Sequence, residues 1–362
     1  MREKLMNATG GGFYRESNIE LLRILCIIGI LMMHTFSSVY SKVSGFNLVY
    51  GTFINSICNT GVSIFVLISG YFGIKTNIRK IVSIEMVTVF YAFLSLVAQY
   101  FVGQTISIKD IFYSCFPVSS KMYWYITAYM LMMIFADYIN LLPEKLDKKG
   151  FQRLILIMLL VFSVLPSILQ IHVMNDYGKG VLNMLLIYLI GRYIRKFDLE
   201  IKEEFKAVKI IFLLFGIEFA LNYGLSMLKG GVGVYAPFAR DYSIFIVALS
   251  VLIFLLVKKV HVSSSLINIL AKNVIGVYLL EGAIRQIIGI RLDINAYVDC
   301  WYLFVIITII SLINFTICSL IEMLRRNTIA HIEAPAAKFF AVLIKQAEDR
   351  VLRKVDGYKT NC

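Results

Sequence analysis

Long apolar segments separated by short polar stretches make up most of the sequence. About twenty apolar residues are needed for an α-helix to cross a hydrocarbon core of roughly 30 Å. Segments near that length are 19–39, 48–72, 81–103, 122–142, 151–171, 180–195, 207–229, 240–258, 266–290 and 299–324. The sixth is short, and the ninth contains Lys272, Glu281 and Arg285. The pattern predicts an all-α, polytopic membrane protein of about ten transmembrane helices.

The Lys and Arg residues between these segments predict the orientation of the chain. Cytoplasmic loops of membrane proteins carry an excess of Lys and Arg. With a cytoplasmic N-terminus, most of the 36 Lys and Arg residues fall in cytoplasmic stretches. We therefore expect both termini in the cytoplasm. The chain then divides into a cytoplasmic segment 1–18, a membrane domain 19–324 and a cytoplasmic tail 325–362.

Apolar residues recur at helical spacing among basic residues in this tail. One interpretation is a basic amphipathic helix that lies on the anionic cytoplasmic leaflet. The other is a partly helical tail in solvent.

The composition supports a membrane environment. Hydrophobic residues make up 59% of the chain and charged residues 16%, whereas soluble domains average about 25% charged residues. The net charge of +13 lies in short loops between apolar segments, so no nucleic-acid partner is predicted. Six scattered cysteines, without a CxxC motif or a His/Cys cluster, predict no metal site.

The first apolar segment contains three ionisable residues, Glu20, Arg23 and His34. An ionisable side chain inside a span costs on the order of 2.5–3.5 kcal/mol, so it usually faces a cavity or a partner. At about 100° per residue, Arg23 and His34 lie within roughly 20° of each other on one helix face. Glu20 is one turn before Arg23 and can pair with it.

This stripe has two interpretations. In the first, Arg23 reaches the inner interface beside Glu20 and His34 bridges two helices. In the second, neutral His34 accepts a proton from a hydroxyl and so activates it as a nucleophile. A cation near the cytoplasmic mouth then suits an anionic ligand.

Two further segments have both a structural and a chemical interpretation. The second span ends in small residues that favour close helix packing, Gly61, Ser69, Gly70 and Gly73. Lys75, Arg79 and Lys80 follow, and they suit either a phosphate or ordinary positive-inside anchoring.

The fourth span opens with Tyr123, Trp124 and Tyr125, which fit either an interfacial aromatic belt or stacking on a sugar. In the ninth span, Glu281 and Arg285 are one turn apart and are expected to pair.

Together these segments resemble membrane acyltransferase family 3, bacterial integral-membrane enzymes that acylate cell-surface glycans. The resemblance covers about residues 15–324. Glu20, Arg23 and His34 match an acidic-x-x-Arg-x10-His signature, and the stretch 61–71 matches a Gly-Val-x-x-Phe-x-x-x-Ser-Gly-Tyr segment. The stretch 123–125 is similar to the family's aromatic opening of a later span, and 276–280 to its late Gly-x-Tyr-Leu-x run.

The resemblance implies transfer of an acyl group, usually acetyl from acetyl-CoA, to a glycan hydroxyl in the bacterial inner membrane. It implies that His34 is the catalytic residue and that Arg23 is its partner or a donor contact. Glu20, which can pair with Arg23, completes the predicted catalytic set. The substrate-binding candidates are Ser69, Lys75, Arg79, Tyr123, Trp124, Glu281 and Arg285. Acyl-CoA acts as a cosubstrate, and no resident cofactor is expected. Glu281 stands where many relatives have a histidine, so a role carried by that histidine does not transfer directly.

Two other classes of function remain open from the sequence. A transporter or flippase for a lipid-linked saccharide or exopolysaccharide also needs a polar cavity inside the membrane. A multi-helix sensor or scaffold requires neither Arg23 nor His34.

Overall fold

The computed structural model describes residues 16–171 and 174–359, with side chains up to residue 353. Within these ranges every regular element is a helix, and a single β-bridge joins Ser44 to Val232. The fold class is therefore all-α, as predicted. Most of the predicted N-terminal segment, residues 1–15, lies outside the described residues.

The first half of the described chain forms the helices between Ser17 and Leu169. Their bounds are α2 (Ser17–Ser37), α3 (Gly45–Cys58), α4 (Thr60–Phe72), α5 (Ile78–Phe101), α6 (Ile108–Cys115), α7 (Trp124–Ile134), α8 (Ala136–Lys145), α9 (Lys148–Leu159), the π-helical turn η1 (Leu160–Val164) and α10 (Leu165–Leu169).

The second half continues in the same way. Its elements are α11 (Val181–Lys196), α12 (Glu204–Leu228), η2 (Pro237–Ala239), α13 (Ile244–Lys259), α14 (Ser265–Ala271), α15 (Val274–Arg291), η3 (Ile294–Tyr297), α16 (Leu303–Thr328) and α17 (Ala330–Lys359).

Each of the ten predicted apolar segments is largely helical, but they differ in length. Six helical stretches among the described residues are long and apolar enough to span a membrane. The pairs α7–α8 and α14–α15, bent by 64° and 56°, raise the number to eight if each pair is one span. Helices α11 and α13, with 16 residues each, are shorter than the other candidates. The count of ten and the orientation of the termini remain predictions.

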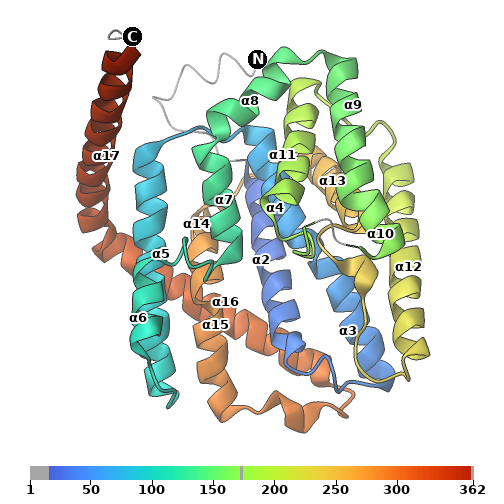
Figure 1. Cartoon of the computed structure of the whole chain (residues 1–362). Helices are drawn as coiled ribbons and strands as arrows, with labels where there is room; N and C mark the ends of the chain where they lie inside the picture. Colours follow the sequence, from blue (N-terminus) through green and yellow to red (C-terminus); the bar gives the residue numbers. More distant parts are fainter. Residues whose placement is uncertain (1–15, 172–173, 360–362) are drawn as a thin grey trace.

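Helices α7, α11 and α13 occupy only one half of the bundle, the upper half in Figure 1. The chain segments that precede them therefore lie part-way along the bundle. Irregular backbone at such a depth needs protein partners for its N–H and C=O groups. Thr76 supplies such partners at the bend between α7 and α8. Its hydroxyl donates to the Met133 carbonyl oxygen at 3.2 Å and accepts from the Asp137 N–H at 3.3 Å.

Helix α2 runs through the middle of the bundle (Figure 1). It contacts α3, α4, α13, α14, α15 and α16. Its residues belong to all three apolar clusters of the core, with Leu22 in the cluster around α4 and α11, Leu31 in the cluster around α15, and Phe36 in the third. A helix in this position has few directions in which a charged side chain can point to lipid.

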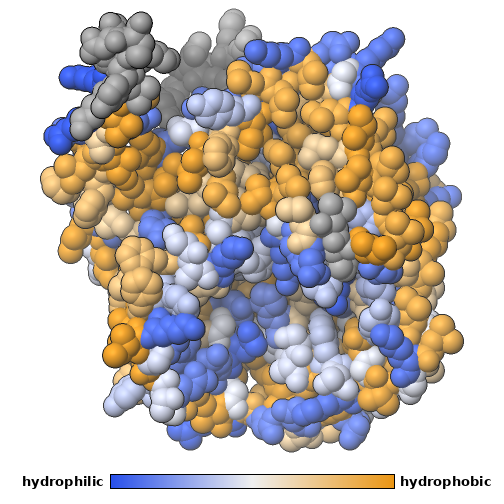
Figure 2. Space-filling model, viewed as in Figure 1, coloured by the Kyte–Doolittle hydropathy of each residue, from blue (hydrophilic) through white to orange (hydrophobic). Residues whose placement is uncertain are grey.

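The exterior is apolar over a wide area. Figure 2 shows hydrophobic residues over most of the upper part of the molecule, whereas polar residues gather in a hollowed area at the lower centre. Helix α12 has many large exposed apolar side chains, including Phe212 and Leu213. Such a surface suits lipid as the surrounding solvent. Together with the long apolar helices, this surface indicates a multi-pass membrane protein.

The tail beyond residue 324 is helical and packs along α5, as Figure 1 shows. A buried ion pair fixes its start: Arg325 donates to Glu322 at 2.7 and 2.9 Å and also contacts Glu333 of α17. The Tyr91 hydroxyl of α5 donates to Glu322 at 2.6 Å. These contacts join α5, α16 and α17.

Helices α4 and α11 pack closely because each has a glycine at the contact. A Cβ atom on Gly70 would lie 2.2 Å from the carbonyl oxygen of Tyr188, and one on Gly191 would lie 2.4 Å from that of Leu67. Both obstacles are backbone atoms, which cannot move aside by a rotamer change. The small residues of the second span therefore do favour close packing, as their pattern predicted.

We expect Gly70→Ala and Gly191→Ala each to destabilise the protein by about 1–3 kcal/mol, the usual cost of overpacking. Gly216→Ala and Gly224→Ala in α12 are matched controls, since nothing lies within 4 Å of a Cβ atom at either position. The measurement is the apparent unfolding temperature of the detergent-solubilised protein. Equal temperatures for the two pairs of variants would contradict this packing argument.

Candidate active site

A cavity of about 530 Å³ lies beside α2, with walls from α4, α5, α7 and α15 and from the segments that precede α11 and α13. Three positively charged side chains lie on the part of its wall nearest the start of α2 and α5, namely Arg23, Lys80 and Lys272. The other part of its wall includes Tyr177, Lys179, Arg240 and Asp241. The cavity thus connects two groups of polar residues through the bundle.

One face of α2 lines this cavity along several turns. Arg23, Ile27, Ile30 and His34 are all on the wall, at spacings of four, three and four residues. This is the repeat of one α-helical face. The prediction that Arg23 and His34 lie on one stripe is confirmed, and the stripe faces a cavity rather than lipid.

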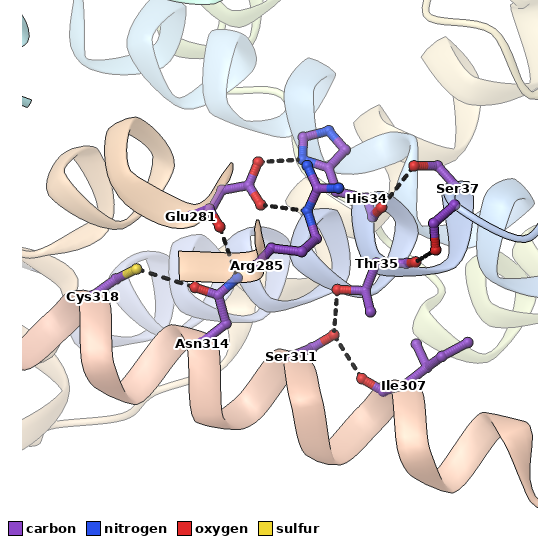
Figure 3. A network of polar contacts seen from close by, with 10 residues as sticks. His34, Thr35, Ser37, Glu281, Arg285, Ile307, Ser311, Asn314 and Cys318 are labelled. Atoms are coloured by element: carbon purple, nitrogen blue, oxygen red, sulfur yellow. Dashed lines mark hydrogen bonds and ion pairs between the residues drawn. The ribbon is translucent and has the colours of Figure 1, made fainter. Parts of the chain in front are cut away.

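His34 pairs with Glu281 of α15 across the interface of the two helices. The Nδ1 atom of His34 lies 2.8 Å from Oε1 of Glu281, as Figure 3 shows. The His34 side chain is 35% exposed, whereas the Glu281 side chain is only 9% exposed. The imidazole therefore reaches the cavity, and the carboxylate lies behind it.

Glu281 is itself held by two neighbours (Figure 3). Arg285, one turn further along α15, donates from Nε to Glu281 Oε2 at 3.4 Å, so the predicted pairing of these residues is confirmed. The Asn314 side chain of α16 donates to the Glu281 carbonyl oxygen at 3.0 Å. With both carboxylate oxygens engaged, Glu281 has little freedom to turn away from His34.

This pairing determines which nitrogen of His34 is available for chemistry. A carboxylate only accepts hydrogen bonds when ionised, so the His34 proton belongs on Nδ1. The lone pair is then on Nε2, which points away from Glu281 in Figure 3. A carboxylate in this position also stabilises the imidazolium that forms when Nε2 takes a proton. The arrangement can act as a general base toward a hydroxyl in the cavity.

The end of the cavity near the start of α2 is basic. Arg23 is partly exposed and lies 3.5 Å from Glu20, a loose ion pair. Neither Lys80 nor Lys272 has an ion pair within 4 Å among the described residues. Lys272 lies at the bend between α14 and α15. Three cations around one mouth attract an anionic ligand.

Aromatic rings cover much of the remaining wall. Tyr125 and Tyr129 stack one turn apart with ring centroids 6.2 Å apart, and Tyr278 meets Tyr125 edge to face at 5.8 Å. Trp124 lies beside them on the wall, and the Lys179 ammonium is 5.7 Å from its ring centroid. Such rings offer flat, amphipathic surfaces for a ligand.

The predicted site residues separate into two groups. Arg23, His34, Ser69 and Trp124 line the cavity. The others do not line it, although Glu281 and Glu20 contact residues that do: Glu20, Lys75, Arg79, Tyr123, Glu281 and Arg285.

Several cavity residues were not among the predicted substrate-binding residues. The sequence placed Lys80 in a basic cluster with Lys75 and Arg79, but the apolar character of α5 all round gave no signal for which member of that cluster faces inward. Lys272 had a signal, since it is a charge inside an apolar segment. Lys179, Arg240 and Asp241 come from segments far apart in the sequence, and they meet only in the folded chain.

The described residues contain no group of three or more His, Cys, Asp or Glu side chains suited to a metal ion.

A family model for an acyltransferase domain matches residues 16–323, most of the chain. The chain belongs to acyltransferase family 3. No curated protein and no solved structure matches it. The matched range includes α2, α4 and α15, so it contains both residues of the His34–Glu281 pair. The chain is accordingly a membrane acyltransferase.

We expect Glu281→Gln to lower the acyltransferase rate by on the order of 10²- to 10⁴-fold, because an amide neither fixes the His34 tautomer nor stabilises its charged form. Arg285→Met is the control, since it removes the outer contact and leaves the His34–Glu281 contact. The acyltransferase rate of Arg285→Met should fall much less than that of Glu281→Gln. Initial rates at equal amounts of folded protein make the comparison, and a fully active Glu281→Gln variant would refute the role of the pair.

Proposed function

We propose that this acyltransferase transfers an acetyl group from acetyl-CoA to a hydroxyl of a cell-surface or lipid-linked glycan. The observation that carries the proposal is the single cavity that leads from Arg23, Lys80 and Lys272 past His34 to Lys179 and Asp241. A donor and an acceptor can approach His34 from opposite ends of such a cavity. Acetyl is proposed because the sequence resemblance implies it as the usual group.

The donor is proposed to bind at the basic end. Coenzyme A carries several phosphate charges, and Lys and Arg side chains are the usual partners of phosphate. We assign this end to the cytoplasm, in agreement with the excess of Lys and Arg in the predicted cytoplasmic loops. Both termini then lie in the cytoplasm, and the enzyme lies in the bacterial inner membrane.

The proposed reaction needs one proton transfer at His34. The acceptor hydroxyl donates its proton to Nε2 while its oxygen attacks the thioester carbonyl carbon. The C–S bond breaks as the new C–O ester bond is retained, and the CoA thiolate takes the proton from the imidazolium. The sum of these steps is an ester and a free thiol, with no net change in protons.

Radiolabelled acetyl-CoA separates this proposal from a transporter. The enzyme in membrane vesicles should move the acetyl label to glycan, whereas a transporter or flippase leaves the label on CoA. We expect His34→Ala to abolish the transfer at unchanged protein level, since it removes the base. His261→Ala, at an exposed histidine outside the cavity wall, is the matched control. Transfer by His34→Ala at the normal rate would disprove the assignment.

The basic end has a separate test. We expect Lys80→Ala and Lys272→Ala each to raise the KM for acetyl-CoA severalfold, because each removes a cation from the wall of the donor mouth. Lys75→Ala and Arg79→Ala, at exposed positions outside that wall, should change it much less. Steady-state kinetics of the four variants measure the difference. Larger KM changes in Lys75→Ala and Arg79→Ala than in Lys80→Ala and Lys272→Ala would contradict this assignment and indicate a donor site at Lys75 and Arg79.

A further inference from the structure

The segment 236–244, between α12 and α13, is held in place from several sides. Four side chains from other elements bond its backbone. The contacts are Asn222 Oδ1 with Phe238 N–H at 3.0 Å, Asn59 Nδ2 with Ala239 O at 2.6 Å, Asn183 Nδ2 with Asp241 O at 3.1 Å, and Ser167 Oγ with Ile244 N–H at 3.0 Å. A segment with this many ties keeps one conformation, so the residues it presents have fixed positions.

A second segment, 176–180, packs directly on the first. Gly178 has a φ of +83°, and a Cβ atom there would lie 2.4 Å from the Tyr242 nitrogen. Its carbonyl accepts from Asn183, the same side chain that bonds Asp241 O. This close approach brings Lys179 and Asp241 to one end of the cavity.

Asp241 is an unusual residue on this wall. It is only 6% exposed, yet its Oδ1 atom has no hydrogen-bond partner among the described residues. Buried polar atoms without a partner are rare in folded proteins, and each requires an explanation. Oδ1 is enclosed by the protein, and no hydrogen bond from the described residues reaches Oδ2 either. Because Asp241 lines the cavity, a ligand there can donate to Oδ2.

An ion pair with a neighbouring cation does not account for the buried Asp241 carboxylate. Lys179 and Arg240 are nearby cations on the same wall, but neither is within 4 Å of a carboxylate oxygen among the described residues. Both instead lie over aromatic rings, Lys179 over Trp124 at 5.7 Å and Arg240 over Tyr177 at 5.2 Å. The carboxylate is left to accept from another group.

We propose that Asp241 holds the acceptor by accepting a hydrogen bond from one of its hydroxyls, with Trp124 as the surface on which a sugar ring rests. A carboxylate acceptor and an indole on the wall of one cavity suit a polyol that has both O–H donors and an apolar face. The hydroxyl bound by Asp241 is distinct from the one that reacts at His34. Asp241 is thus a specificity-determining residue for the acceptor.

This inference rests on the proposed function, and its test separates the two. The purified full-length enzyme in lipid nanodiscs receives radiolabelled acetyl-CoA, and membranes of a strain lacking this chain supply the acceptor. Asp241→Asn should raise the amount of acceptor membrane needed for half-maximal transfer by about tenfold, because the hydrogen bond then goes to a neutral amide instead of a charged carboxylate. The KM for acetyl-CoA should stay the same.

Two further variants complete the test. Trp124→Leu should raise the acceptor requirement in the same way, and Asp293→Asn, at an exposed carboxylate outside the cavity wall, should not. Stabilisation by CoA in a thermal unfolding assay shows that each variant is folded.

The outcomes distinguish the two proposals. An unchanged acceptor requirement in folded Asp241→Asn, with or without a loss of stability, overturns the assignment of Asp241 and leaves the acetyl transfer intact. No transfer of label by the wild-type enzyme overturns the proposed function itself.

Discussion

The contact between the His34 imidazole and the Glu281 carboxylate joins two helices whose residues are far apart in the sequence. It lies where α2 and α15 meet, and Arg285 and Asn314 fix Glu281 from the other side. In a low-dielectric interior, such a hydrogen bond is stronger than in water, and an unpaired carboxylate is costly. The direction of the His34 ring and the free Nε2 atom depend on this contact. The chemistry of the cavity therefore follows from one charge-assisted pair.

A second constraint on the cavity is the shortness of α7, α11 and α13. Because these helices fill only one half of the bundle, the segments before them lie part-way along it. Backbone groups at that depth cannot rely on water and need partners within the protein. Asn59, Asn183 and Asn222 supply those partners for the segment that carries Asp241. The bonds that satisfy the irregular backbone also make it rigid, and a rigid segment is what a binding surface requires.

The two ends of the cavity differ in the state of their charges. At one end, Lys80 and Lys272 have no ion-pair partner among the described residues, which suits a ligand with several negative charges. At the other, the cations lie over rings and a buried carboxylate is close by. The two ends of the cavity therefore suit different ligands, in agreement with the proposed phosphate-rich donor at one end and hydroxyl-rich acceptor at the other. His34 lies on the wall between them.

The sequence by itself determined the helical class, the approximate limits of the apolar segments, the shared face of Arg23 and His34, and the small residues where α4 packs on α11. All of these follow from composition or from the 3.6-residue repeat, which are local properties of the chain. Tertiary structure alone decided that Glu281 is the partner of His34, that Lys80 rather than Lys75 or Arg79 lines the cavity, and that Asp241 reaches it. These facts depend on which helices become neighbours and how each is rotated about its axis. An almost uniformly apolar helix in lipid gives no periodic signal for that rotation, so only packing determines it.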